Sequence, residues 1–274
     1  MPDNSNRLEP EKLAELANIL QDVKVWVREV GKIQKENLGK ENLLVETKSS
    51  EVDLVTEIDK LSEEYFLKAI SAKYPGHSIL SEEAGENEHT GSAYRWIIDP
   101  IDGTTNYAQG LPIFAISVAL QYQEETVLGV IYIPMLDLLF EAIKGQKAFV
   151  NGKKISVGAK TNLRECLLST GFPYDQARNP DNNTNYFTHF VPLARGIRRL
   201  GSAAYDLANV AAGILDGHWE LNLNLWDVAA GFLLVEEAGG KIIPLENKRG
   251  VSFVAGNQAV ADMVYQEIRS LDKK

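Results

Sequence analysis

The segment WIIDPIDGTTNY, residues 96–107, ends an apolar run with two carboxylates three positions apart, Asp99 and Asp102. Pro100 fixes the backbone angle φ between them, so the chain should turn there and bring both carboxylates to one edge of a sheet. The carbonyl oxygen of Ile101 would then point between them. Oxygen ligands of this kind suit Mg²⁺ or Mn²⁺ rather than zinc, because the chain has 1 cysteine and 4 histidines.

Gly103 and Thr104 follow the second carboxylate directly. Their backbone N–H groups, at an expected helix start, are suited to hold an anion such as phosphate. The alternative is that Asp99 and Asp102 only form a turn, which Asp102 caps with its side chain. A cation site beside an anion site would instead indicate chemistry on a phosphate ester.

Acids recur at two other expected element ends. Glu82 and Glu83 follow a short strand pattern in ILSEEAG, and Asp227 precedes the apolar run of WDVAAGFLLVEEAGG. Taken singly, the two glutamates fit a solvated turn and Asp227 fits the N-cap of a helix. Their recurrence at element ends favours one shared site.

The composition narrows the class of protein. The 274 residues are 45% hydrophobic, which is enough to form the core of one large domain or two small ones. With 28 basic and 38 acidic residues the net charge is −10, and no basic run stands out, so nucleic acid is not an expected partner. Motifs of the types G-x-G-x-x-G, G-x-x-x-x-G-K-[ST] and G-x-S-x-G are absent from the sequence.

The cysteine count and the start of the chain bear on location. Cys166 is the single cysteine, which excludes an internal disulfide and a C-x-x-C zinc or redox site and fits a reducing compartment. The first residues lack the basic and apolar pattern of a signal peptide, and no apolar stretch approaches the about 18 residues of a membrane span. We therefore expect a cytoplasmic protein with no membrane partner.

The elements that must position these acids follow from the spacing of apolar residues. Apolar residues at three- and four-residue steps predict helices, and short β-branched runs between turn residues predict strands, of which those after residue 112 form an antiparallel meander. The expected helices are 13–30, 61–74, 186–194, 202–215, 228–238 and 260–271, and the expected strands are 77–80, 93–98, 112–120, 126–133, 138–143, 148–150 and 217–223. We expect two subdomains, 1–154 with most metal ligands and 155–274 with Asp227 and a substrate loop.

Four segments together resemble the inositol monophosphatase family of Mg²⁺-dependent, lithium-sensitive phosphatases. They are WIIDPIDGTTNY, DLVTEID (53–59), SEEAG (81–85) and WDVAAGFLLVEEAGG (226–240), and TGFPYDQ resembles the bacterial and plant-type members. The similarity implies the α+β fold class, as a layered αβαβα sandwich of the inositol monophosphatase / fructose-1,6-bisphosphatase type. It also implies a homodimer.

The resemblance implies the metal ligands. Glu82, Asp99 and the carbonyl of Ile101 would hold one Mg²⁺, and Asp99, Asp102 and Asp227 would hold a second, with Asp99 bridging the two. Two or three ions per site are expected, with Mn²⁺ as a substitute.

The catalytic residues are implied in the same way. Thr104 and Asp53 would form a hydrogen-bonded pair near the attacking water, and Glu82 would orient that water through the metal. Glu83 would lie behind the metal ligands. Lys48 matches a basic residue near the site, although an exposed surface lysine is an equally good interpretation.

The substrate side of the site has one distinctive acid. Glu220 lies seven residues before Asp227, where inositol-preferring members carry an acid that binds hydroxyl groups, although Glu220 also fits an exposed strand end. Asp102 would accept another hydroxyl of a polyol. The substrate-binding residues implied are Glu82, Ile101, Asp102, Gly103, Thr104, Gly201, Ser202, Ala203, Glu220 and Asp227.

The expected reaction is hydrolysis of myo-inositol 1-phosphate to inositol and phosphate by direct attack of a metal-activated water. No nucleophile motif stands out, so no phosphoenzyme is expected. The alternatives are a histidinol-phosphate phosphatase or a fructose-1,6-bisphosphatase with the same fold, and more remotely a noncatalytic binding protein.

Overall fold

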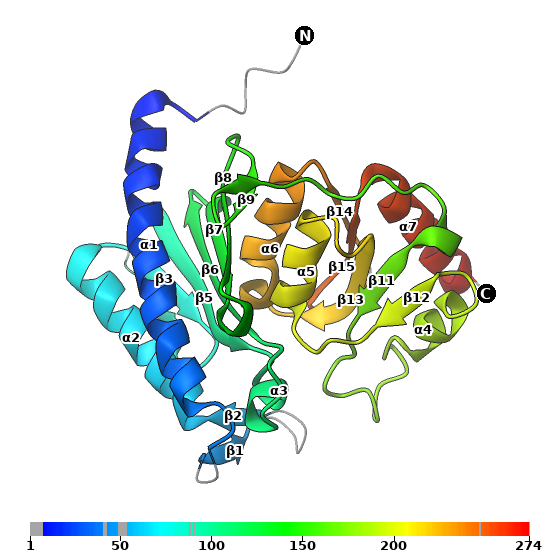
Figure 1. Cartoon of the computed structure of the whole chain (residues 1–274), viewed down its shortest axis with the longest axis horizontal. Helices are drawn as coiled ribbons and strands as arrows, with labels where there is room; N and C mark the ends of the chain where they lie inside the picture. The colour runs from blue at the N-terminus through cyan, green and yellow to red at the C-terminus, as the bar shows by residue number, and fades with distance from the viewer. Residues whose placement is uncertain are drawn as a thin grey trace.

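The protein is an α+β sandwich in which layers of helix and sheet alternate in the order αβαβα (Figure 1). The α+β class and the αβαβα layering expected from the resemblance are confirmed. In the part of the chain that the structure describes, none of the helices combines the length and apolar character needed to cross a membrane. The computed structural model describes residues 8–40, 43–48, 54–87, 89, 91–246 and 248–273.

The first helical layer consists of α1 (Pro10–Asn37) and α2 (Glu57–Lys73). Apolar residues at three- and four-residue steps give α1 a stripe that is buried against the first sheet, as the sequence predicted. Thr56 is the N-cap of α2, and Asp59 completes a capping box with it. A short antiparallel pair, β1 (Val45–Thr47) and β2 (Leu54–Thr56), precedes α2.

The first sheet has the strand order β10-β9-β8-β7-β6-β5-β3-β4. The run from β6 to β9 is the expected antiparallel meander, which β5 and β10 extend at its two ends, whereas β3 pairs with β5 in parallel. The strands are β3 (Ser78–Ser81), β4 (Gly85–Asn87), β5 (Tyr94–Asp102), β6 (Ala115–Tyr122), β7 (Glu125–Ile133), β8 (Leu138–Ile143), β9 (Ala148–Val150) and β10 (Lys153–Lys154).

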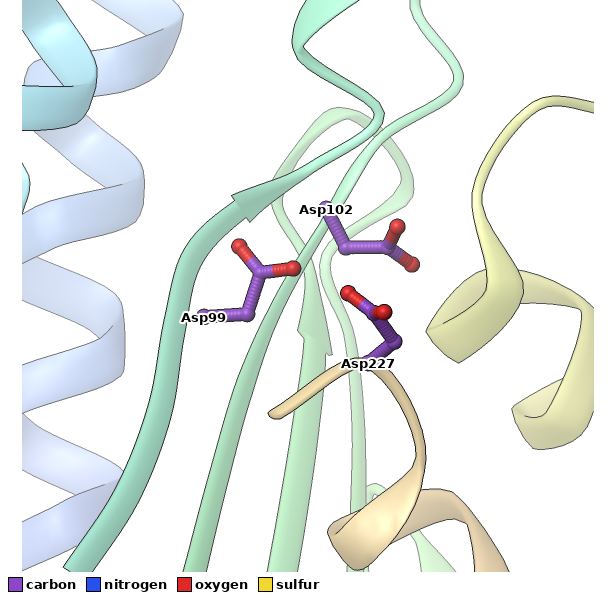
Figure 2. Close-up of side chains that lie close together, drawn as sticks. All are labelled: Asp99, Asp102 and Asp227. Carbon is purple, nitrogen blue, oxygen red and sulfur yellow. The ribbon is translucent and has the colours of Figure 1, made fainter. Parts of the chain in front are cut away.

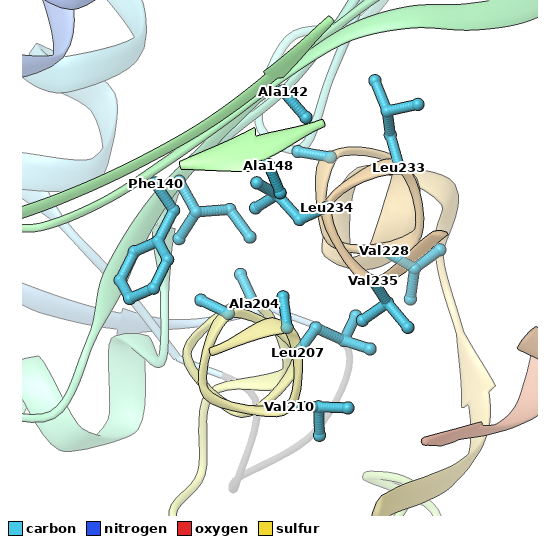
Figure 3. Close-up of a cluster of buried hydrophobic side chains, with 14 of the residues drawn as sticks. Phe140, Ala142, Ala148, Ala204, Leu207, Val210, Val228, Leu233, Leu234 and Val235 are labelled. Atoms are coloured by element: carbon cyan, nitrogen blue, oxygen red, sulfur yellow. The ribbon is translucent and has the colours of Figure 1, made fainter. Parts of the chain in front are cut away.

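The middle layer is formed by α5 (Ala203–Ala211) and α6 (Leu225–Glu237), whose apolar side chains meet those of the first sheet (Figure 3). Small residues allow a close approach: a Cβ added to Gly129 of β7 would lie 2.9 Å from the carbonyl oxygen of Ala230. The same core includes Phe253 and Ala255 of the second sheet. One shared core therefore joins both sheets through α5 and α6.

The second sheet has the order β12-β11-β13-β15-β14, and α4 (Thr184–Phe190) and α7 (Gln258–Asp272) cover its outer face. The sequence predicted β13 but missed the other four strands, which are short or follow glycine-rich turns. The strands are β11 (Leu167–Thr170), β12 (Gly196–Arg198), β13 (Gly217–Leu223), β14 (Lys241–Pro244) and β15 (Val251–Gly256).

The chain passes from the first sheet to the second between β10 and β11. The division into subdomains 1–154 and 155–274 stays a prediction, because α5 and α6 bury one apolar core against both sheets. A one-turn helix, α3 (Thr104–Ala108), follows β5 at the edge of the first sheet. This is the helix start expected after Gly103.

Candidate active site

Three aspartates come together where β5 ends and α6 begins (Figure 2). Each of Asp99, Asp102 and Asp227 offers one carboxylate oxygen, and these oxygens all lie within 4.8 Å of one another. Successive side chains of a strand alternate between faces, so residues three apart should point to opposite faces. The pairing of β5 with β6 is irregular between Asp99 and Asp102, and the extra residue of this bulge lets both carboxylates face the same side.

Asp99 is the most deeply placed of the three, with 1% of its surface exposed. Its Oδ1 atom has no hydrogen-bond partner among the described residues. Burial raises the pKa of Asp99 well above its usual value, and the charges of Glu82, Asp102 and Asp227 raise it further. The pocket therefore concentrates negative charge around a buried oxygen that no described side chain satisfies.

Asp102 links the first sheet to the start of α5, about 100 residues further along the chain. Its Oδ2 atom accepts hydrogen bonds from Ser202 Oγ at 2.7 Å and from the backbone N–H of Ala204 at 2.5 Å. Burial raises the pKa of Asp102 to about 7, although these two hydrogen bonds lower it. In Asp227, burial likewise raises the pKa well above its usual value, and Oδ2 accepts the backbone N–H of Asn224 at 2.6 Å.

The donor set fits a hard divalent cation. The converging atoms are carboxylate oxygens, one of them buried without a hydrogen-bond partner, and the described part of the pocket contributes no thiol or imidazole to the group. The carbonyl oxygen of Ile101 lies at the same edge and accepts the hydroxyl of Thr104 at 3.0 Å. The roles of these atoms as ligands stay predictions.

Glu82 and Glu83 lie at the end of β3, beside the aspartates, and both contact Lys48. Lys48 Nζ lies 2.8 Å from Glu82 Oε1 and also bonds Glu83 Oε1. Burial lowers the pKa of Lys48, but the charge and hydrogen bonds of the two glutamates outweigh it and raise that pKa. Lys48 therefore lies in the site, contrary to the surface interpretation that the sequence left open.

The hydroxyl of Thr104 is bonded to Asp59, whereas the resemblance implied Asp53. Thr104 Oγ lies 2.9 Å from Asp59 Oδ1, and Asp59 Oδ2 accepts the backbone N–H of Thr56 at 2.9 Å. Asp53 lies outside the described residues. Both acids belong to DLVTEID, and only Asp59 occupies the first turn of α2, which faces α3. Burial raises the pKa of Asp59 to about 6, although the hydrogen bonds from Thr56 and Thr104 lower it.

The expected substrate loop packs directly on the turn after Asp102. Gly103 has φ of 101°, and a Cβ there would lie 3.1 Å from the carbonyl oxygen of Gly201. Gly201 has φ of 85°, and its own Cβ would meet a side-chain nitrogen of Arg199 at 2.6 Å. Ser202 is the N-cap of α5 and accepts the N–H of Tyr205 at 3.3 Å. Gly103 and Gly201 thus allow the turn after Asp102 to pack closely against the loop that precedes α5.

A cavity of about 830 Å³ joins these groups. Its lining includes the three aspartates, Glu82, Ile101, Gly103, Thr104, the loop from Gly201 to Ala203 and Glu220 in the middle of β13. Glu220 is 8% exposed, so the alternative of an exposed strand-end acid is wrong. Arg178 and Arg199 also line the cavity. Neither arginine was singled out from the sequence, although Arg199 lies two residues before the expected substrate loop.

The chain belongs to the inositol monophosphatase family, whose model matches residues 15–271. Among curated relatives, a protein of Aquifex aeolicus named fructose-1,6-bisphosphatase/inositol-1-monophosphatase is 39% identical over 252 residues, which cover 92% of this chain and 95% of the relative. A protein of Pseudomonas aeruginosa named Nus factor SuhB is 44% identical over 194 residues, covering 69% and 72%.

Solved structures agree with this assignment. The inositol monophosphatase of Anabaena (Nostoc) sp. PCC 7120 is 36% identical and has a TM-score of 0.83, with 93% of this chain and 97% of that chain covered. A structure described as an IMPase/NADP phosphatase complexed with Mg²⁺ and phosphate is 27% identical, with a TM-score of 0.80 and coverage of 92% and 95%. The family and the fold are thereby shown.

Proposed function

We propose that the protein is a Mg²⁺-dependent phosphomonoesterase that hydrolyses myo-inositol 1-phosphate to inositol and phosphate by direct attack of water. The observation that carries this proposal is the meeting of Asp99, Asp102 and Asp227 in a cavity that also contains Glu220. The three aspartates suit a phosphate with its counterions, and Glu220 suits the hydroxyl groups of a polyol. Membership of the family supports the reaction class.

The acidic cluster would hold the metal. Asp99, Asp102, Asp227, Glu82 and the carbonyl of Ile101 are the proposed ligands of two or three Mg²⁺ ions, with Mn²⁺ as a substitute. When bound, these ions offset the charge of the phosphate ester and lower the pKa of water. Without such positive charge, the negative pocket of a protein of net charge −10 would repel a phosphate ester.

Asp59 and Thr104 provide an acceptor for the proton of the attacking water. Thr104 takes this proton on its hydroxyl oxygen while its own proton passes to Asp59, 2.9 Å away. A carboxylate with a pKa of about 6 is ionised at neutral pH and is a stronger base than an ordinary aspartate. The oxygen–phosphorus bond to the sugar alcohol breaks as the water oxygen bonds to phosphorus, and the alcohol leaves with a proton from solvent.

The rest of the cavity would bind the substrate. The amides of Gly103 and Thr104 and the loop from Gly201 to Ala203 are proposed to contact the phosphate end. Glu220 would accept hydrogen bonds from vicinal hydroxyls, which bind a carboxylate more strongly than a neutral acceptor.

A second candidate substrate is fructose 1,6-bisphosphate. Arg178 and Arg199 line the same cavity and could bind a second phosphate, which an inositol monophosphate lacks. The name of the Aquifex aeolicus relative couples both activities. The two candidates share the acidic cluster and differ in their use of the arginines.

A substrate panel tests the proposal. Phosphate release is measured with and without Mg²⁺ from inositol 1-phosphate, fructose 1,6-bisphosphate and histidinol phosphate in parallel. Mg²⁺-dependent preference for inositol 1-phosphate supports the proposal, whereas preference for the bisphosphate, reduced by Arg199→Ala, supports the second candidate. Absence of release from all three would overturn both and favour a noncatalytic role.

Two further expectations concern the protein as a whole. We propose a homodimer that lithium inhibits, located in the cytoplasm and acting without nucleic acid or membrane. Analytical ultracentrifugation and an inhibition series with lithium chloride check the first two of these.

A further inference from the structure

A buried histidine lies directly behind Glu220. His218 precedes Glu220 by two residues in β13, so both side chains lie on the face of the second sheet that α5 covers. The intervening Trp219 points to the opposite face, into the core formed with α4 and α7. The side chain of His218 is 0% exposed. Nothing in the proposed reaction uses this group.

Each side of the imidazole ring meets a different element. His218 Nε2 lies 3.1 Å from Glu220 Oε2, and Nδ1 lies 2.9 Å from Ser169 Oγ of β11. From α5, Asp206 Oδ2 lies 3.8 Å from Nδ1. From β15, the ring of Phe253 packs against the imidazole with centroids 5.4 Å apart. The groups facing His218 are therefore two carboxylates, one hydroxyl and one aromatic ring.

This surrounding favours a charged imidazole. Burial lowers the pKa of His218, but the contact with Glu220 and the charge of Asp206 outweigh it and raise that pKa above its usual value. The N–H of Nε2 is not aligned on the carboxylate as in a good hydrogen bond, so the contact with Glu220 is mainly ionic. Burial also raises the pKa of Asp206 to about 8, although His218 lowers it, so at pH 7 the charge of the imidazole depends mainly on its contact with Glu220.

The opposite side of the Glu220 carboxylate is closed by backbone. A Cβ added to Gly171 would lie 1.7 Å from Glu220 Oε1, so the absence of a side chain there makes room for the carboxylate. Glu220 is thus held between Gly171 and His218, with 11% of its side chain exposed to the cavity. A carboxylate buried to this degree requires a partner, because an unpaired buried charge is costly.

We propose that His218 is a positioning residue that holds the carboxylate of Glu220 at the mouth of the cavity and so sets the preference for polyol phosphates. This inference rests on the proposed function of Glu220 as the ligand of substrate hydroxyls. His218 contacts neither phosphate nor metal ligand in the geometry described, so it should affect recognition of the polyol and leave the chemical step unchanged.

The test compares two phosphate esters and a small set of variants. Inositol 1-phosphate carries the vicinal hydroxyls, and phenyl phosphate lacks them. His218→Phe keeps a buried ring but removes the charge, and His218→Gln places an amide N–H near the position of Nε2. His189→Phe is the matched control, because His189 of α4 pairs with Glu267 of α7 at 2.8 Å, away from the cavity.

The proposal expects a change in KM that depends on the substrate. His218→Phe should raise KM for inositol 1-phosphate on the order of tenfold, with kcat within about twofold, and should leave phenyl phosphate hydrolysis unchanged. His218→Gln should recover only part of the loss, because its amide N–H can donate to the carboxylate but carries no charge. In the Glu220→Gln background, His218→Phe should have no further effect on KM. Equal losses on both substrates, or additive losses in the double variant, would overturn the proposal.

A spectroscopic measurement covers the case in which His218→Phe does not fold. Long-range ¹H–¹⁵N spectra report the protonation of each imidazole nitrogen in the full-length protein. Both nitrogens of His218 should be protonated at pH 7, and Glu220→Gln should lower the pKa of His218. An unchanged pKa in Glu220→Gln would show that the two side chains are not coupled and would overturn the inference.

Failure of the proposed function would be visible in the wild type alone, as a lack of Mg²⁺-dependent release from either ester. A wild type that prefers inositol 1-phosphate, with a KM that His218→Phe leaves unchanged, would overturn the role of His218 and leave the proposed function standing.

Discussion

The substitution Asp99→Asn removes one charge from a pocket in which three carboxylate oxygens lie within 4.8 Å of one another. A buried acid whose pKa is raised by folding takes up a proton when the protein folds. The free energy of unfolding therefore falls as the pH rises from the unfolded pKa to the folded pKa. For Asp102 these limits are 3.8 and about 7. In metal-free protein, the acidic cluster should destabilise the fold increasingly over this range.

The pKa of Asp102 shows what it costs to ionise an acid buried in this cluster. A rise of about three units, at about 1.4 kcal/mol each, costs about 4 kcal/mol once Asp102 is ionised. An amide at position 99 adds no charge, and its N–H₂ can donate to a neighbouring carboxylate. Asp99 carries the same kind of cost, because burial and the charges of Glu82, Asp102 and Asp227 raise its pKa well above the usual value. We expect Asp99→Asn, which removes that cost, to raise the free energy of unfolding at pH 8 on the order of 3 kcal/mol, with little change at pH 5.

Urea unfolding in EDTA at pH 5 and pH 8 measures this difference, and repeating it with Mg²⁺ measures the coupling to the ion. Wild-type protein should gain stability with Mg²⁺ at pH 8, because an ion that binds only the folded state stabilises it. Asp99→Asn should gain much less and should show no turnover. Asp262→Asn, at an exposed pair with Lys241, is the matched control and should leave the pH dependence unchanged.

Two results would refute the reasoning. A metal-free Asp99→Asn protein that is less stable than wild type at pH 8 would show that the carboxylates do not repel one another as described. Retained turnover at the same Mg²⁺ concentration would remove Asp99 from the metal site.

Three other substitutions probe separate parts of the cavity. Asp59→Asn should lower kcat by about 100-fold or more, because it removes the proton acceptor. The kcat of the wild type should decrease when the pH is lowered past about 6, where Asp59 takes up a proton, and a pH-rate profile of both proteins checks this. Glu220→Gln should raise KM for inositol 1-phosphate by about tenfold and leave phenyl phosphate unaffected, as steady-state kinetics would show. Gly171→Ala should displace Glu220 and reproduce that KM change, and a smaller rise than in Glu220→Gln would contradict the close packing.

The local elements of the first half could be predicted because each pattern is short in range. The short apolar runs of β6 and β7 and the apolar stripe of α1 each involve residues only a few positions apart. In the second half, β11, β12, β14 and β15 were missed. They are short, and their pairing joins segments far apart in the chain, as between β11 and β13, so burial on the sheet decides their structure more than their own sequence.

The candidate site also has features that could be predicted from the sequence and features that depend on packing. The motif DPIDGTT, the oxygen-only ligand set and the family could be predicted from the sequence, because residue type and spacing carry that information. Asp59 was a different matter. Its bond to Thr104, at 2.9 Å, depends on how α2 lies against α3. Asp53, the other acid considered in DLVTEID, lies outside the described residues, and its role stays a prediction.

The amino-acid sequence by itself determined which chemistry is available here: carboxylate oxygens for a hard cation, glycines for a close turn, and the order of motifs that defines the family. The tertiary structure alone decided which acids lie close enough to other groups to affect each other's pKa and hydrogen bonding. Asp102 of the first sheet meets the start of α5, and Glu220 meets His218 of its own strand and Gly171, which follows the neighbouring strand β11. Electrostatic energy depends on distance and burial, and both are set when the layers pack together.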